Sequence, residues 1–177
     1  MTRIRLALPT DAAALAALAE RTFRDTFAVD NTPEDMAAHV AQSYSPDHQA
    51  RELSDPARTT FVAEGPSGEL TAYAQLRAGA APACVTGPAP LELCHFYVER
   101  AHHGQGLAQQ LMTAVLESAA RRGAATLWLG VWERNPRAQA FYRKYGFVDV
   151  GAHTFVLGSD HQTDRLMARP LVGPGAA

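Results

Sequence analysis

The sequence predicts an α/β protein with a mixed, strongly twisted sheet of about seven strands flanked by helices. Two observations carry this prediction. Segments of strand composition alternate along the chain with segments whose apolar residues recur at helical spacing. Residues 91–98 form an apolar run of strand length, and a glycine-containing turn then leads into a helical pattern that begins at Leu107. The 177-residue chain predicts one domain over residues 1–171 and a disordered tail at 172–177.

The amino-terminal part is expected to hold one strand and three helices. Residues 3–8 alternate in the manner of a strand, and the alanine-rich residues 11–27 predict a helix. Thr32-Pro33 and Ser45-Pro46 each place a capping hydroxyl before a proline at the first helical position. They predict helices that begin there, the second ending near Leu53.

The remaining elements follow from the same periodicities. Residues 59–63 and 69–77 predict a hairpin around a glycine-rich turn, and residues 78–90, rich in Ala, Gly and Pro, predict a mobile loop. Further segments complete the sheet and its covering helices: strands at 91–98, 125–131, 147–157 and 163–169, and helices from 107 to about 122 and over 136–144.

Composition excludes several classes of function. A formal charge of −2 gives no case for nucleic acid or an anionic membrane as partner. No signal peptide opens the chain and no apolar run reaches membrane-spanning length, so we expect a cytoplasmic protein. Cys84 and Cys94 are the two cysteines, and the strand position of Cys94 favours a small apolar side chain over a disulfide. His102 and His103 are adjacent, but a metal site requires more ligands.

The glycine turn before Leu107 is a candidate anion site. Gly104 and Gly106 let the backbone approach a ligand, and the free N–H groups of the first helical turn point at it. A tight connection without a ligand is the alternative. Neither a Gly-Lys-Ser/Thr triplet nor a dinucleotide fingerprint is present, which disfavours a nucleoside triphosphate or a dinucleotide. A cofactor that is held by its pyrophosphate and reacts elsewhere fits these residues.

Two segments resemble the GNAT superfamily of acetyl-coenzyme A-dependent N-acetyltransferases. His103, Gly106 and Ala108 match the signature Gln/Arg-x-x-Gly-x-Gly/Ala, with histidine in place of the usual first residue. Because the family uses this loop mainly through backbone amides, we expect the change to be tolerated. Residues 135–147 resemble the family's Asn-x-x-Ala-x-x-Phe-Tyr-x-x-x-Gly-Phe. The resemblance covers roughly residues 3–171.

This resemblance implies acetyl-coenzyme A as co-substrate and no metal. It places the pyrophosphate on the amides of the glycine turn, the pantetheine arm along the preceding strand, and a backbone N–H near Val98 as a donor to the thioester carbonyl. The cofactor-binding residues that it implies are Phe96, Tyr97, Val98, His103, Gly104, Gln105, Gly106, Leu107, Ala108, Asn135 and Tyr142.

Acetyl transfer to an amine requires a neutral amine and a proton for the departing thiolate. Glu92 is the candidate base, directly or through water, because some family members have a glutamate base there and an unpaired carboxylate in an apolar strand is costly. The alternatives are that Glu92 is exposed or paired with an arginine. His95 could serve instead, although strand alternation places it on the opposite face from Glu92 unless a bulge intervenes. Tyr142 matches the family's tyrosine acid, and it could instead only hydrogen-bond the sulfur.

A finer resemblance concerns the acceptor. Residues 92–98, 130–135 and 155–167 look like a bacterial branch that contains spermidine/spermine N-acetyltransferases. Between residues 25 and 55 we count seven acids against one base, and an acidic wall would concentrate a cationic amine. Helix-start acids and solvated surface are the alternative explanation. The candidate substrate-binding residues are Phe27, Asp30, Tyr73, Gln75 and Glu92, with a core role equally expected for Tyr73.

Three functions remain open. The first is acetyl transfer from acetyl-coenzyme A to a small primary amine such as a polyamine. The second is acetylation of a protein N-terminus or lysine, which an open groove would favour. The third is a non-catalytic acyl-coenzyme A-binding regulatory protein, against which the joint presence of Glu92 and Tyr142 argues. The sequence also allows a homodimer.

Overall fold

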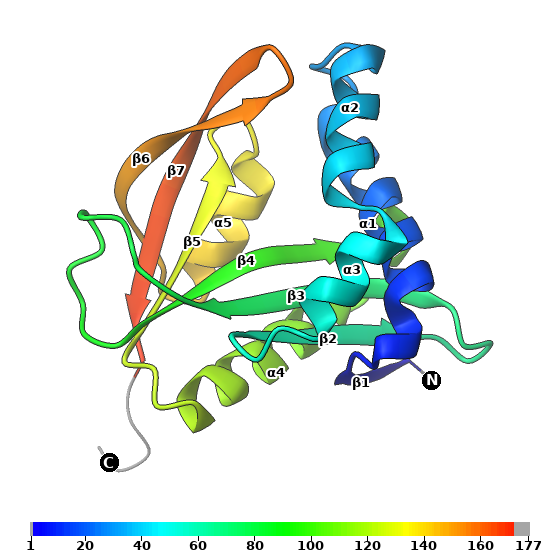
Figure 1. The fold of residues 1–177 in the computed structure, drawn as a ribbon. Coiled ribbons are helices and arrows are strands. Elements are labelled where there is room, and N and C mark those ends of the chain that lie inside the picture. Colours follow the sequence, from blue (N-terminus) through cyan, green and yellow to red (C-terminus); the bar gives the residue numbers. More distant parts are fainter. Residues whose placement is uncertain (1, 172–177) are drawn as a thin grey trace.

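The computed structural model describes residues 2–171 and has the mixed α/β fold that the sequence predicts (Figure 1). Its seven-stranded sheet has the order β1-β2-β3-β4-β5-β7-β6, and β4 and β5 are the one parallel pair in this sheet. The predicted tail at 172–177 lies outside the described residues. The elements are β1 Arg3–Leu6, α1 Ala12–Phe27, α2 Pro33–Ser43, α3 Pro46–Leu53, β2 Arg58–Glu64, β3 Leu70–Ala78, β4 Pro90–Val98, α4 Leu107–Arg121, β5 Thr126–Trp132, α5 Pro136–Lys144, β6 Val148–Leu157 and β7 Asp160–Pro170.

The predicted caps of two helices are confirmed. The Thr32 hydroxyl accepts a hydrogen bond from the Asp35 amide and the Ser45 hydroxyl accepts one from the His48 amide, each at 3.2 Å. The first helix begins one residue later than expected, because Asp11 ends a short 3₁₀ turn and its carboxylate accepts the Leu8 amide at 2.6 Å.

The helices cover both faces of the sheet. One core cluster packs α4 and α5 against one face, with Leu111, Met112 and Phe147 almost fully buried. A second cluster packs α1 and α2 against the opposite face, where Phe23 and Leu157 are buried. Strand alternation separates the two clusters, since Phe61 and Val62 of β2 belong to different ones.

The segment that was predicted to be a mobile loop is partly packed. Val85 is buried against Trp128 and Leu166, and the Thr126 hydroxyl donates to the Pro88 carbonyl at 2.9 Å. Both cysteines are free, as expected. Mobility of this segment stays a prediction.

The central strands β4 and β5 pair over only three residues, Pro90–Glu92 with Thr126–Trp128, and then diverge (Figure 1). Beyond this point the backbone groups of β4 that face β5 have no strand partner. Backbone N–H and C=O groups that are buried without a hydrogen-bond partner cost free energy. The divergence therefore offers a strand edge to an extended ligand in the middle of the sheet.

A bulge at Cys94 changes which side chains of β4 share a face. Leu93 pairs with Leu76 and His95 pairs with Gln75, so Cys94 is the extra residue. The bulge named as the exception in the sequence analysis is therefore present, and His95 lies on the same face as Glu92. Glu92, His95 and Tyr97 pair with alternate residues of β3 and lie on the face covered by α1.

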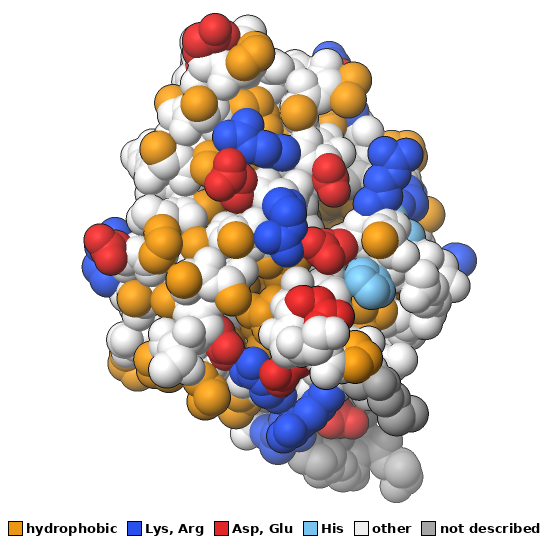
Figure 2. All heavy atoms as spheres, turned by 90° about the vertical axis from the view of Figure 1, so that its right-hand side faces the viewer, with side chains coloured by type: hydrophobic (Ala, Val, Ile, Leu, Met, Phe, Trp, Pro, Cys, Tyr) orange, Lys and Arg blue, Asp and Glu red, His pale blue; other side chains and the backbone are white. Residues whose placement is uncertain are grey.

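The surface carries charges of both signs. Figure 2 shows lysine, arginine and acidic side chains interspersed over the face seen from the right of Figure 1, with neither sign forming a continuous field there. None of the helices within residues 2–171 is both long and apolar enough to cross a membrane.

Candidate active site

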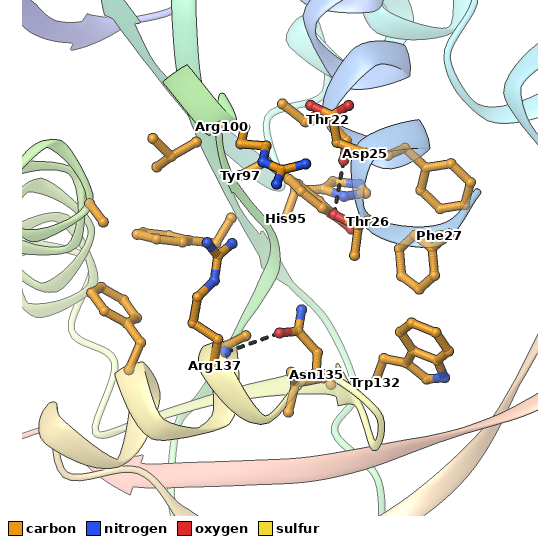
Figure 3. Close-up of a pocket in the computed structure, with 18 of the residues that line it drawn as sticks. Thr22, Asp25, Thr26, Phe27, His95, Tyr97, Arg100, Trp132, Asn135 and Arg137 are labelled. Atoms are coloured by element: carbon orange, nitrogen blue, oxygen red, sulfur yellow. Dashed lines mark hydrogen bonds between the residues drawn. The ribbon is translucent and has the colours of Figure 1, made fainter. Parts of the chain in front are cut away.

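A cavity of about 900 Å³ opens where β4 and β5 diverge. Its walls come from α1, α2, β4, the glycine turn, the end of β5, and α5 (Figure 3). It has two chemically different ends. Residues of the glycine turn and α5 line one end, and aromatic and acidic side chains of α1, α2, β5 and β6 line the other.

The glycine turn presents free donors to the cavity. Gly104 and Gly106 adopt φ values of +75° and +82°, which other residues rarely do. The amides of residues 104–109 donate to no carbonyl or side chain in the described structure, and the Gln110 amide is the first to bond back, to the Gly106 carbonyl at 3.1 Å. No atom lies within 4 Å of a Cβ built on either glycine. Free amides at an open helix start suit a diphosphate, so the turn fits the coenzyme that the sequence implied.

His103 links three parts of this end of the cavity. Its Nδ1 lies 2.7 Å from an Arg137 guanidinium nitrogen and its Nε2 lies 2.8 Å from the Val98 carbonyl oxygen. Because a guanidinium only donates, Nδ1 accepts, which assigns the proton to Nε2 and makes it the donor to Val98. The ring therefore fixes the turn to β4 and α5. Arg100 and Arg137 direct their guanidinium groups into the same space (Figure 3).

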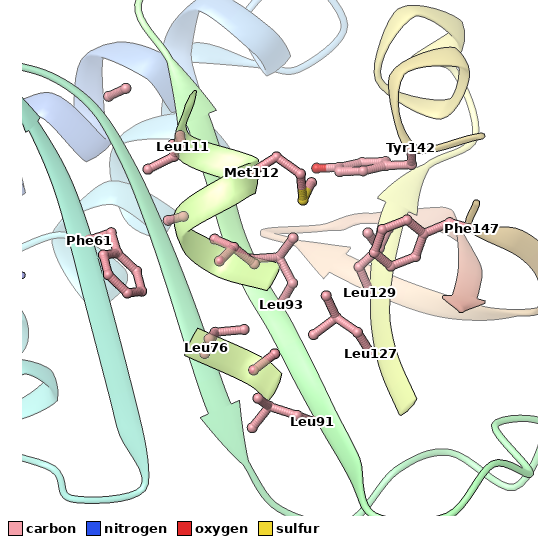
Figure 4. Packing of buried hydrophobic residues seen from close by; sticks show 14 of the residues in the cluster. Phe61, Leu76, Leu91, Leu93, Leu111, Met112, Leu127, Leu129, Tyr142 and Phe147 are labelled. Carbon is pink, nitrogen blue, oxygen red and sulfur yellow. The ribbon is translucent and has the colours of Figure 1, made fainter. Parts of the chain in front are cut away.

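The α5 helix supplies Asn135 and Tyr142. The Asn135 side-chain oxygen accepts the Ala138 amide at 3.1 Å, which caps the helix (Figure 3). The Tyr142 ring is buried edge-on against Phe96 and Phe147, and Figure 4 shows its hydroxyl directed toward Met112. Burial raises the pKa of Tyr142 well above its ordinary value. The phenol therefore stays protonated at neutral pH and is a hydrogen-bond donor.

The other end of the cavity is aromatic and carries neutral histidines. The Phe27 and Trp132 rings lie 5.1 Å apart, and His39 stacks on Phe23 at 4.6 Å. Burial lowers the pKa of His39, and burial lowers the pKa of His95 to about 4. Both imidazoles are therefore neutral at pH 7 and add no positive charge to this end.

Two of the seven counted acids, Asp25 and Asp30, line the cavity. Glu52 and Asp55 pair with Arg58 instead, and Asp35 accepts hydrogen bonds from the Ser159 amide and hydroxyl at 3.1 and 3.0 Å. The main cavity therefore includes two of the seven acids, and three others are bound by Arg58 or Ser159.

The structure does not bring Glu92 to the cavity. One of its oxygens accepts two hydrogen bonds from the Arg77 guanidinium, at 2.5 and 2.9 Å, and Glu92 is absent from the cavity wall. The arginine-paired alternative is thus the one observed. The cause is the strand register, which sets Glu92 directly opposite Arg77.

Tyr73 and Gln75 do not line the cavity either. Tyr73 is a core residue that stacks on Tyr97 at 5.6 Å. The Gln75 amide lies between Arg58, at 2.6 Å, and Thr60, at 3.1 Å, in a buried polar network. Phe27 and Asp30 are the predicted acceptor residues that the cavity does include.

Several lining residues were not anticipated. His39, Trp132 and Asp164 come from α2, β5 and β7 and meet at this cavity only in the folded chain. The segment around Asp164 resembles a family branch, but its sequence does not show that Asp164 faces the site, because the pairing of β5 with β7 is not readable from sequence. Within residues 2–171, no group of three or more His, Cys, Asp or Glu side chains is placed to hold a metal.

Comparison with known families identifies the class. The model of the acetyltransferase (GNAT) family matches residues 15–147, and the chain belongs to this family. The protein is an acetyl-coenzyme A-dependent N-acetyltransferase.

Individual relatives agree with this class. An uncharacterized N-acetyltransferase of Mycobacterium bovis is 40% identical over 163 residues, which cover 92% of this chain and 99% of that one. An uncharacterized N-acetyltransferase of Lactobacillus delbrueckii subsp. lactis is 35% identical over 156 residues, covering 88% and 90%. The PaiA N-acetyltransferase of Thermoplasma acidophilum, solved in complex with coenzyme A, has a TM-score of 0.78 at 18% identity and covers 96% of this chain and 99% of that one. At that identity the likeness shows the fold.

Proposed function

We propose that this enzyme transfers the acetyl group of acetyl-coenzyme A directly to a primary amine of a small cationic compound, with polyamines as the first class to test. One observation carries the proposal. A single cavity joins a turn of free amides and arginines at one end to acids and neutral aromatic side chains at the other. The first end suits a polyanionic coenzyme and the second suits a cation.

For the coenzyme, the amides of residues 104–109 would hold the diphosphate and the unpaired edge of Phe96–Val98 would accompany the pantetheine arm. A backbone N–H near Val98 is the proposed donor to the thioester carbonyl. When bound, the coenzyme supplies the activated acetyl group. Asn135 borders the same channel.

Tyr142 is proposed to act on the departing sulfur. Tyr142 lines the cavity, and its hydroxyl makes no hydrogen bond to another described residue. Because burial raises the pKa of this phenol, a hydrogen bond to the thiolate requires less free energy than complete proton transfer. We therefore assign Tyr142 the stabilisation of the leaving group, with proton transfer as its completion.

The charges at the acceptor end support a cationic amine. Asp30 lines both the main cavity and a neighbouring hollow of about 430 Å³. That hollow also contains three further acids, Asp35, Glu133 and Asp160, beside Arg134 and His161. An acceptor with a second ammonium group could place it there. The faces of Phe27 and Trp132 suit the ammonium that enters the main cavity.

A panel of acceptors tests the proposal by release of free coenzyme A thiol. We expect turnover with putrescine or spermidine, and slower turnover with butylamine, which has one amine on a chain of the same length as putrescine. Preference for peptides that carry a free N-terminus or lysine would support the protein acetyltransferase instead. Coenzyme binding without thiol release on any amine would contradict the proposal and favour the non-catalytic alternative. The homodimer stays a prediction.

A further inference from the structure

Asp164 reaches the cavity from β7, outside the two segments that match the GNAT superfamily motifs. In the sheet register it pairs with Trp132 of β5 on one side and His153 of β6 on the other. It lines the cavity together with Gly130 and Trp132. Tyr97 of β4 lines the same cavity, and the Asp164 charge adds to burial in raising the pKa of this tyrosine.

Gly130 keeps this carboxylate open to the cavity. A Cβ built at residue 130 would lie 3.4 Å from Asp164 Oδ2 and 3.4 Å from His153 Nε2. Any side chain there would therefore rest on the carboxylate and separate it from the cavity. With glycine, a ligand that passes β5 meets the carboxylate itself.

The carboxylate of Asp164 is not held by an arginine, unlike other acids of this sheet. Glu92 is held by Arg77 and Asp149 by Arg165, whereas Asp164 accepts no hydrogen bond from a described residue that meets ordinary distance limits. His153 Nε2 lies 3.7 Å away, and the Asp164 side chain is 17% exposed. A largely buried carboxylate with no short hydrogen bond is costly unless a ligand supplies one.

The electrostatic surroundings favour a proton acceptor. Burial raises the pKa of Asp164 above its ordinary value, His153 of β6 opposes the rise, and Glu133 after β5 adds to it. Tyr97 of β4 also faces it. Glu92 is held by Arg77 away from the cavity, and burial lowers the pKa of His95 to about 4, which makes it a weaker base than an ordinary histidine.

We propose that Asp164 is the catalytic group that removes the proton from the acceptor ammonium, an inference that rests on the proposed function. The ammonium gives one proton to the carboxylate, and the freed lone pair of nitrogen attacks the acetyl carbon. The carbon–nitrogen bond forms, the carbon–sulfur bond breaks, and the electron pair leaves on sulfur. The thiolate then takes a proton, with Tyr142 as donor, and the product nitrogen loses its extra proton to restore the phenol.

The first test is Asp164→Asn, which keeps the size of the side chain and removes the base. We expect kcat/KM for the best amine to fall about 100-fold or more. The parent enzyme should gain activity as pH rises through the pKa of Asp164, and the variant should lack this acid limb. Coenzyme affinity, measured by calorimetry, should stay within about twofold, because Asp164 lies at the acceptor end.

Asp149→Asn is the matched control. Asp149 is a carboxylate of the neighbouring strand β6 that pairs with Arg165 at 2.7 Å and does not line the cavity. We expect its kcat/KM and pH profile to match those of the parent. A loss equal to that of Asp164→Asn would show a general effect of removing charge from these strands, and would overturn the assignment.

Gly130→Ala provides a second, independent variant. The added methyl fits at ordinary contact distance and covers the carboxylate without removing it. We expect kcat/KM to fall by about tenfold with coenzyme affinity and thermal stability retained. If Asp164→Asn kept the kcat/KM and pH profile of the parent, or if Gly130→Ala kept full activity, the assignment of Asp164 would be overturned and the proposed function would stand. A parent enzyme inactive on every amine would overturn the proposed function and Asp164's role with it.

Discussion

At the scale of single residues, the partner of each acidic side chain decides its role. Glu92, Asp149 and Asp164 are carboxylates on three strands of one sheet. Arginines neutralise the first two, and the third faces the cavity beside a glycine. A free carboxylate in a cavity can bind or accept a proton, whereas a paired one mainly fixes neighbouring strands.

Tyr142→Phe removes the hydroxyl proposed to act on the leaving sulfur. We expect the turnover number to fall by about one to two orders of magnitude with coenzyme affinity within about twofold, because the ring keeps its packing. Steady-state kinetics and calorimetry measure the two quantities. Tyr145→Phe, directly after the same helix, is the control, since Tyr145 does not line the cavity. An unchanged turnover number in Tyr142→Phe rules out the proposed role.

Glu92→Gln addresses the base that the family likeness suggested. Since Glu92 is bound to Arg77 outside the cavity, we expect kcat/KM within about threefold of the parent and a superimposable pH profile. The half-exposed Arg77 limits the lost stability to about 1 kcal/mol, or roughly 2–4 °C in melting temperature. If the activity of the variant recovered only at high pH, Glu92 would be the base after all.

At the scale of elements, the start of α4 is built around left-handed glycines. The helix begins at Leu107, and Gly106 before it has φ +82° and ψ −3°. This conformation turns the chain so that successive amides face one space without a capping side chain. The same conformation recurs at Gly123, after the other end of the helix, where no ligand site adjoins it.

Gly106→Ala should therefore weaken coenzyme binding. A left-handed alanine costs about 1–2 kcal/mol, so the turn relaxes and we expect the Kd for coenzyme A to rise by about tenfold. No atom stands within 4 Å of the new methyl, so the cost is in the backbone. Gly123→Ala imposes the same backbone strain away from the cavity and should lower stability without changing the Kd. Equal loss of affinity in both variants would contradict the role of the turn.

At the scale of the whole molecule, the sheet consists of two parts joined through a short parallel seam. The seam is the three-residue pairing of β4 with β5. The helices α4 and α5 pack against the same face of the sheet. The cavity lies in this gap, so a ligand there contacts both parts. Binding to the folded state alone raises stability by mass action.

Coenzyme A at about 100 times its Kd should add about 2.7 kcal/mol and raise the melting temperature by roughly 5–10 °C. Differential scanning fluorimetry measures this shift, with inorganic phosphate at equal ionic strength as the control. Hydrogen exchange should slow both at residues 98–109 and at the start of α5, because the ligand bridges the two parts. Protection confined to one part would contradict the bridging position.

Local patterns were sufficient for much of this fold. The hydroxyl-proline pairs before α2 and α3 act through atoms three residues apart, and the glycine turn acts through its own backbone, so each could be recognised from a short segment. The acceptor site could not be recognised in this way. The bulge at Cys94 places His95 on the same face of the sheet as Glu92, and Arg77 of β3 forms an ion pair with Glu92 of β4.

The sequence by itself determined the α/β class, the order of the elements and the glycine turn before α4, because these depend on periodicity and on neighbours within one turn or strand. The tertiary structure alone decided where β4 and β5 separate, which carboxylates find arginines, and that Asp164 of β7 meets Gly130 and Trp132. Those outcomes depend on strand register between segments that are separate in sequence, 15 residues apart for Arg77 and Glu92 and more than thirty for β5 and β7, and register is set by packing of the whole sheet.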